Sequence, residues 1–207
     1  MILGFAHLAI NTDDLVRFEP AWLALGYQRA AFHRTVPNNA AKRLFTDHYQ
    51  PEHDLMLLQG TGLWPLELTC HGPVRGENRQ LAWGPDAIRV EVNEPDRLRK
   101  LLVEGVGFRE AAHAELSLDS RLPGWSCRLC LGPGDAPPVR LDAAGPTCLA
   151  FYSNRIEEDA HRLLDLGASD YSGIFPLTLA ERAMNIALLR APGGPLLELI
   201  SPRTRTP

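Results

Sequence analysis

Apolar and polar positions along this chain follow the same order three times. In each repeat an apolar strand leads into a stretch whose apolar residues recur three or four positions apart, which predicts an amphipathic helix. The stretch ends at a glycine followed by an apolar residue, and short extended segments come next. Self-similarity of this kind determines the architecture, so it has to be established before any local element is predicted.

The repeats begin at Phe5, Ala87 and Thr147. Their last extended segments are centred on an x-Leu/Val-x-Leu core, as PLELT at 65–69, PVRLD at 138–142 and PLLELI at 195–200. The predicted helices end at Gly26, Gly107 and Gly167, and glycine suits the left-handed position that ends a helix.

Each repeat therefore predicts a β-α-β-β-β module. We expect an α+β fold of three such modules, with mixed, mostly antiparallel sheets curled around a cavity and helices outside. In the first helix, Asn11 and Thr12 are candidates for the N-cap, and Pro20 requires a kink or a later start. The predicted organisation is a first module over 1–72, a linker over 73–86, a second module over 87–143 and a third over 144–202.

Composition excludes some partners. The chain has 207 residues and a net charge of −4, with scattered arginines, so it offers no basic surface for nucleic acid. The apolar start MILGFAHLAI lacks the basic region and cleavage site of a leader and is too short to cross a bilayer. We expect a core strand there, no membrane partner and a cytoplasmic protein. Cys127 and Cys130 form a C-x-x-C in a predicted strand, where residues three apart point to opposite faces, so reduced and mostly buried thiols are expected.

Several stretches are similar to one known family. APGGPLLELI at 191–200 resembles the closing D-P-x-G-x-x-x-E-L signature of the vicinal oxygen chelate superfamily, and GLWPLELTCHG at 62–72 is a looser match. AHLAINTDDL resembles the opening strand of that family, with His7 at the position of a metal ligand. The superfamily includes glyoxalase I, bleomycin-resistance proteins, extradiol dioxygenases and methylmalonyl-CoA epimerase. The resemblance implies that paired modules form a cup, with metal ligands from opening and closing strands at its floor.

Carried over position by position, the resemblance implies one ligand set. The first module supplies His7 and Glu67, and the third supplies Glu198 and, where a histidine is usual, Cys148. The second module has Arg89 and Arg140 at the corresponding positions, and arginine cannot bind a cation. A metal centre of this kind suits Zn, Ni, Mn, Co or Fe. The alternative is a protein that binds no metal.

Three modules cannot all pair within one chain, which leaves three arrangements open. If the first two pair, His7 and Glu67 face two arginines, which favours an anionic ligand. If the last two pair, the first module meets its copy in a dimer and unites two histidines and two glutamates. If the first and third pair, the set is His7, Glu67, Glu198 and Cys148. Each arrangement is compatible with a homodimer.

Two functions follow from the residues and the resemblance. The first is a metal-dependent lyase, isomerase or dioxygenase that acts on a small oxygenated metabolite, with Glu67 or Glu198 as the general base. The second is a non-catalytic protein that sequesters a small molecule, as bleomycin-resistance proteins do. The candidate ligand contacts in the second case are aromatic walls and arginines, namely Trp64, Trp125, Phe175, Arg89 and Arg140. His48 and His53 lie in a long polar insertion and are expected to be solvated.

Overall fold

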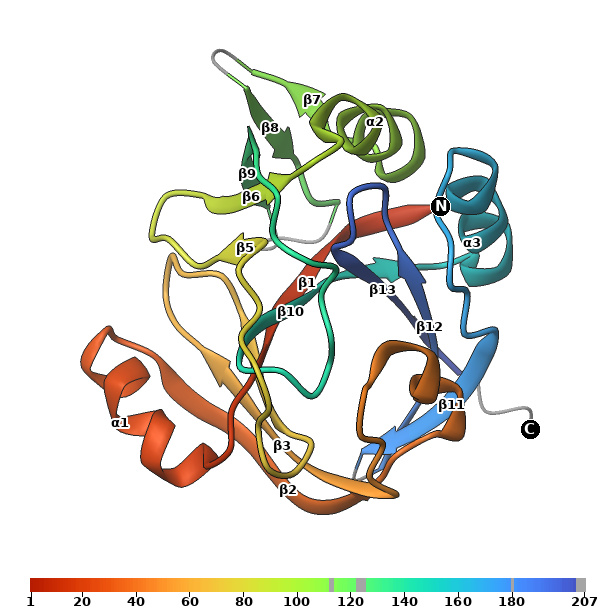
Figure 1. The fold of residues 1–207 in the computed structure, drawn as a ribbon. Helices are drawn as coiled ribbons and strands as arrows, with labels where there is room; N and C mark the ends of the chain where they lie inside the picture. Colours follow the sequence, from red (N-terminus) through yellow and green to blue (C-terminus); the bar gives the residue numbers. More distant parts are fainter. Residues whose placement is uncertain (112–113, 122–125, 180, 204–207) are drawn as a thin grey trace.

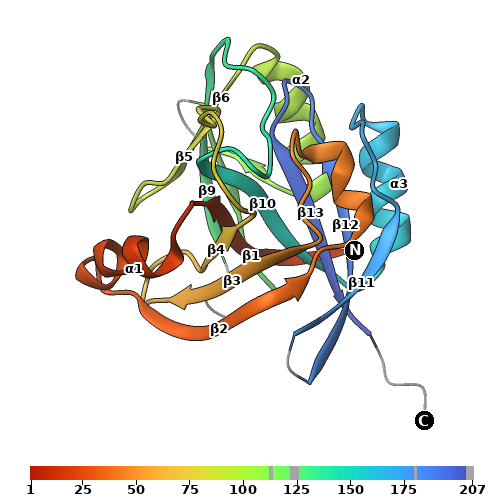
Figure 2. The same cartoon turned by 60° about the horizontal axis from the view of Figure 1, so that its bottom comes forward.

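A computed structural model describes residues 1–111, 114–121, 126–179 and 181–203, and shows two sheets (Figure 1). The larger sheet has eight strands in the order β11-β12-β13-β10-β1-β4-β3-β2. Their bounds are β1 Ile2–Asn11, β2 Gln28–Pro37, β3 Glu52–Gln59, β4 Leu66–Cys70, β10 Gly145–Ser153, β11 Ile174–Leu179, β12 Arg182–Arg190 and β13 Leu196–Pro202. The sheet curls strongly, so that its two ends approach one another across a concave face (Figure 2).

The smaller sheet has five strands in the order β5-β6-β9-β8-β7. Their bounds are β5 Leu81–Ala82, β6 Ile88–Val92, β7 Arg109–Glu110, β8 Glu115–Leu118 and β9 Cys127–Pro133. Together with α2 this sheet forms the upper part of the molecule in Figure 1. A large apolar cluster, which includes Phe5, Leu129 and Phe151, packs the small sheet and the helices against the large sheet.

The ends of the helices are set by capping side chains and by glycines. They are α1 Leu15–Ala24, α2 Pro95–Lys100 with its π-helical continuation η2 Leu101–Val106, α3 Ile156–Asp165 and the 3-10 helix η1 Ala40–Phe45. Asp14 caps α1 by accepting a hydrogen bond from the Arg17 backbone N–H, so the predicted capping by Asn11 or Thr12 is wrong. The glycines predicted to end the helices all have positive φ, at 93° for Gly26, 100° for Gly107 and 99° for Gly167.

One strand order recurs in three stretches of the chain. In each stretch the first and last strands are parallel neighbours, as in β1–β4, β6–β9 and β10–β13. The two middle strands of each stretch are added antiparallel beyond the last strand. The predicted α+β fold with mixed, mostly antiparallel sheets is confirmed.

The closing strand predicted for the second repeat is wrong. The strand parallel to β6 is β9, whereas PVRLD at 138–142 lies outside the strands. Proline has no backbone N–H, and the consecutive Pro137 and Pro138 cannot donate to a sheet. Val139 and Leu141 are instead buried in the apolar cluster on the concave face of the large sheet.

Strand β1 pairs antiparallel with β10, and this contact joins the first and third repeats in one sheet. The second repeat lies in the small sheet. Of the three arrangements left open by the sequence, the structure therefore shows the one that pairs the first repeat with the third. Among the described residues, no helix is long and apolar enough to cross a membrane.

Candidate metal centre

The middle of the large sheet carries polar side chains on its concave face. Alternate residues of a strand point to opposite faces, and on β1 the residues Leu8 and Ile10 pack into the large apolar cluster on the other side. His7 and Ala9 lie on the concave side, where Ala9 belongs to the concave-face cluster. Glu67 on β4 alternates in the same way with Leu66 and is thereby directed into the concave face.

Strand register brings the functional side chains to one point. Ala9 is paired with both Glu67 on β4 and Cys148 on β10. In the same way Ala150 is paired with both His7 on β1 and Glu198 on β13. The two halves of the sheet therefore repeat one pattern. In each half, an alanine on the middle strand lies between two larger side chains on the neighbouring strands. Because alanine is small, side chains from neighbouring strands can meet above it.

The meeting point is a cluster of one histidine and two carboxylates. The His7 Nε2 atom is 3.6 Å from Glu67 Oε2 and 3.5 Å from Glu198 Oε2. Within the described ranges, the potential ligand atoms of these three residues lie within 4.8 Å of one another. Cys148 is not part of that group, although it lines a small cavity next to Glu67 and Glu198.

The cluster fits a divalent metal ion. His7 is 7% exposed, and its Nε2 atom is buried without a hydrogen-bond partner, which is costly for a polar atom. Two ligand atoms that are each about 2.1 Å from one ion lie roughly 3.0 Å apart at a right angle and roughly 3.4 Å apart at a tetrahedral angle. The distances from Nε2 to the two carboxylates are close to these values, so a small movement would let all three residues bind one ion.

Burial and charge also perturb the titration of the cluster. Burial acts to lower the pKa of His7, but the Glu67 and Glu198 carboxylates outweigh it, and the net pKa is raised above 6.5. Burial raises the pKa of Glu67, against the effect of His7, and Glu198 adds to the rise. Burial and Glu198 raise the pKa of Cys148 well above 9.0, which keeps this side chain a neutral thiol.

A small cavity lies above the cluster. Its volume is about 20 Å³, which is enough for a water-sized group and little more. Residues from the strand floor and from a covering segment line it: Ala9, Lys42, Glu67, Thr69, His71, Leu141, Thr147, Cys148, Leu188 and Glu198. The concave face is thus largely filled, in contrast to the open cup that the family resemblance implies.

The covering segment is η1 with the residues that follow it. Phe45 at its end is fully buried in the concave-face cluster, beside Val139 and Leu141. The Asp142 carboxylate accepts hydrogen bonds from the backbone N–H groups of Asp47 and His48. These contacts attach the insertion of the first repeat to the connection between β9 and β10.

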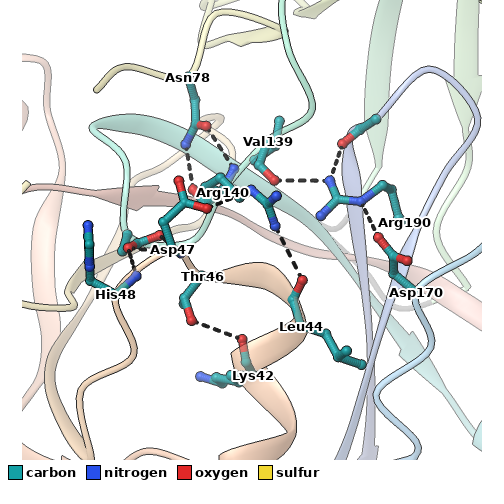
Figure 3. Close-up of polar contacts among 12 residues, drawn as sticks. Lys42, Leu44, Thr46, Asp47, His48, Asn78, Val139, Arg140, Asp170 and Arg190 are labelled. Carbon is teal, nitrogen blue, oxygen red and sulfur yellow. Dashed lines mark hydrogen bonds and ion pairs between the residues drawn. The ribbon is translucent and has the colours of Figure 1, made fainter. Parts of the chain in front are cut away.

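Two arginines strengthen this attachment (Figure 3). Arg140 donates to the Leu44 carbonyl and lies 3.3 Å from the Asp47 carboxylate. Arg190 lies over the Phe45 ring at 5.8 Å, donates to the carbonyls of Val139 and Gly194 and pairs with Asp170 at 2.7 Å. Arg140 therefore holds the covering segment in place and does not line the small cavity.

The other predicted ligand contacts lie apart from the cavity. Trp64 packs edge-on against Phe5 on the opposite face of the sheet and donates its Nε1–H to the Gly84 carbonyl. Arg89 is exposed on β6 of the small sheet. Phe175 is buried in the concave-face cluster with Phe45. Trp125 lies outside the described residues.

Sequence reasoning did not name several polar residues of the cavity lining, Thr147 and three others among them. Lys42, Thr69 and His71 line the cavity. Thr69 and His71 follow Glu67 at steps of two, and this strand period was the signal that could have indicated them. Lys42 had no such signal, because it reaches the site only through the fold of the insertion.

His53 was also misjudged. It is buried and stacks on His71, with ring centroids 4.7 Å apart and an interplanar angle of 10°. The expectation that it is solvated is therefore wrong, whereas His48 is exposed as expected. The four cysteines are free, and Cys127 is buried whereas Cys130 is half-buried.

The chain matches no protein-family model, and no curated protein matches it. Among solved structures it is similar to glyoxalase I from Zea mays, with 15% identity and a TM-score of 0.39 over 96% of this chain and 67% of that chain. It is also similar to a putative dioxygenase from Bacillus subtilis, with 15% identity and a TM-score of 0.40 over 98% of this chain and 64% of that one. A mutant 4-hydroxymandelate synthase from Streptomyces coelicolor shows 16% identity and a TM-score of 0.37, over 98% and 63% of the two chains.

These proteins are longer than this chain, which spans about two thirds of their length. At these identities and TM-scores the matches carry no argument about function, which is inferred from this chain's own residues.

Proposed function

We propose that this protein binds a divalent metal ion through His7, Glu67 and Glu198 and is a metal-dependent lyase, isomerase or dioxygenase acting on a small oxygenated metabolite. The observation that carries the proposal is the buried, unpaired Nε2 atom of His7 between two carboxylates. One imidazole and two carboxylates suit Mn, Fe, Co, Ni or Zn. A divalent ion there would act as a Lewis acid and polarise an oxygen of the substrate.

The residues have distinct roles in this function. His7, on a central strand, would hold the ion as a neutral imidazole, and Glu198 would balance part of its charge. Glu67 is the better supported general base, a role that it would take when displaced from the ion, because burial raises the pKa of its carboxyl group above the ordinary value. The closely packed covering segment excludes bulk water from the cluster and so strengthens each electrostatic interaction in it.

The sequestering function receives less support. A protein that holds an apolar molecule in its cup needs an open cup, whereas Phe45, Val139 and Leu141 fill the concave face. The remaining cavity of about 20 Å³ is too small for a bulky apolar ligand.

Metal titration tests the proposal. Chelator-treated protein is titrated with Co(II) and, in parallel, with Mn, Fe(II), Ni and Zn. We expect His7→Ala and Glu198→Gln to weaken binding at least about 100-fold, because even partners outside the ligand shell are worth about 10- to 100-fold in affinity. Glu91→Gln, at an exposed position on β6, is the matched control and should bind as the natural protein does. Absence of binding to all five ions at high micromolar concentration would end the metal-dependent function.

A further inference from the structure

Lys42 lies on η1 and faces the same small cavity as the two glutamates. Its backbone is fixed from both sides, because its N–H donates to the Asn39 carbonyl at 3.0 Å and its carbonyl accepts from the Thr46 hydroxyl at 3.4 Å (Figure 3). Its side chain is half-buried. The insertion of the first repeat therefore places one ammonium group over the floor that carries His7, Glu67 and Glu198.

The Lys42 ammonium forms no close ion pair with a carboxylate of the described residues. Among the ion pairs within 4.0 Å in the part of the chain that the structure describes, none includes Lys42. Its charge nevertheless reaches the cavity, since it acts to lower the pKa values of Glu67 and of His71. Glu67 and Glu198 are the acidic residues in the cavity lining. Apart from these two and Lys42, the lining consists of apolar residues and polar residues without a carboxylate.

Charge balance in the cavity depends on the metal. Without an ion, the two carboxylates outnumber the single ammonium of Lys42, which leaves no positive charge for a further anion. When a divalent ion is bound by a neutral His7 and two carboxylates, the ion and the carboxylates cancel one another. Lys42 is then left without a counter-charge in a partly buried site, which is unfavourable. A ligand that brings one negative charge would restore the balance.

We infer that the ligand of this cavity is a small organic carboxylate, which binds only with the metal and pairs its negative oxygen with Lys42. This inference rests on the proposed function and adds the class of the substrate to it. Two further polar side chains in the cavity lining, Thr147 and His71, are candidates to contact the remaining oxygen atoms of such an anion, whereas the Thr69 hydroxyl already donates to Asn11 Oδ1 at 3.3 Å. The cavity of about 20 Å³ holds little more than one water-sized group, so a carboxylate of a few heavy atoms enters it only if η1 moves outward.

The experiment compares two probes of equal shape and different charge. Co(II)-loaded protein is titrated with glycolate and with the neutral glycolamide, and the visible Co(II) spectrum and calorimetry report binding. A hydrogen bond to a charged group is worth about 1.5 to 3 kcal/mol, so we expect glycolate to bind at least about 10-fold more tightly than glycolamide. Lys42→Met should abolish that preference and leave Co(II) affinity unweakened, whereas Lys42→Arg should retain most of it.

The outcomes separate the two proposals. Equal affinities for glycolate and glycolamide in the natural protein, or an unchanged preference in Lys42→Met, would overturn the inference while Co(II) binding stands. Failure of the natural protein to bind Co(II) would overturn the metal site and this inference with it. Lys42→Gln, a second uncharged variant, serves if Lys42→Met does not keep the circular dichroism spectrum of the folded protein.

Discussion

At the scale of single residues, His53 and His71 are two buried imidazoles that stack on one another. Burial, with the nearby Lys42 charge, lowers the pKa of His53 to about 3. Burial also lowers the pKa of His71 well below 6.5, and Lys42 and His53 add to the effect. Both rings are therefore neutral in the folded protein at mildly acidic pH.

This neutrality makes stability depend on pH. In the unfolded chain each histidine takes up a proton below about pH 6.5, whereas the folded protein does not until the pH approaches the lowered values. The unfolded state thus binds more protons, and the free energy of unfolding falls as the pH falls from 6.5 toward about 3.

We predict that His53→Phe, which keeps an aromatic ring in the stack, reduces this dependence. The difference in slope from the natural protein should approach about 1.4 kcal/mol per pH unit, the value for one proton. Urea unfolding of both proteins between about pH 6 and pH 4 measures it. Equal slopes would show that His53 takes up its proton in the folded protein as readily as in the unfolded chain.

At the scale of the element, η1 is held by a connection that is distant in sequence. The buried Asp142 carboxylate accepts hydrogen bonds from the backbone N–H groups of Asp47 and His48, at 3.0 Å and 2.7 Å. These two N–H groups lie outside any regular strand or helix. The covering of the candidate metal centre therefore depends in part on this one side chain from the connection between β9 and β10.

We predict that Asp142→Asn loosens this attachment. The amide has one acceptor oxygen and no charge, so the free energy of unfolding should fall by about 1 to 2 kcal/mol. Hydrogen exchange of the Asp47 and His48 amides should accelerate more than exchange in β1. Asp135→Asn, at an exposed position of the same connection, is the control. Unchanged protection of the two amides in folded Asp142→Asn would contradict the role given to Asp142.

At the scale of the whole molecule, the pairing of β1 with β10 places all three candidate ligands in one chain. We predict a stoichiometry of about one metal per chain, whatever the oligomeric state, because no second copy is needed to complete the cluster. Elemental analysis of the loaded protein gives the ratio, and sedimentation tests the separate prediction of a homodimer. A ratio of about one half would indicate a site shared on a dimer axis and would contradict the arrangement within one chain.

Comparison of particular residues shows where sequence reasoning succeeded and where it did not. Local alternation and the helix-ending glycines predicted the strands that carry His7, Glu67 and Glu198, and the structure brings these three together. Trp64 was predicted as a ligand contact, but it packs with Leu66 in the cluster on the opposite face of the sheet. PVRLD has the alternation of a strand but follows two prolines, and it is buried without joining a sheet.

The sequence by itself determined the elements of this protein, because strand alternation, helix period and the steric freedom of glycine act over a few neighbouring residues. Only the tertiary structure decided which repeats share a sheet, since the pairing of β1 with β10 depends on how two faces far apart in the chain fit together. For the same reason only the fold revealed that Lys42 lines the cavity of the candidate metal centre and that His53 stacks on His71 beside it. Their positions depend on an insertion whose contacts with Asp142 and Arg140 are made across about half of the chain.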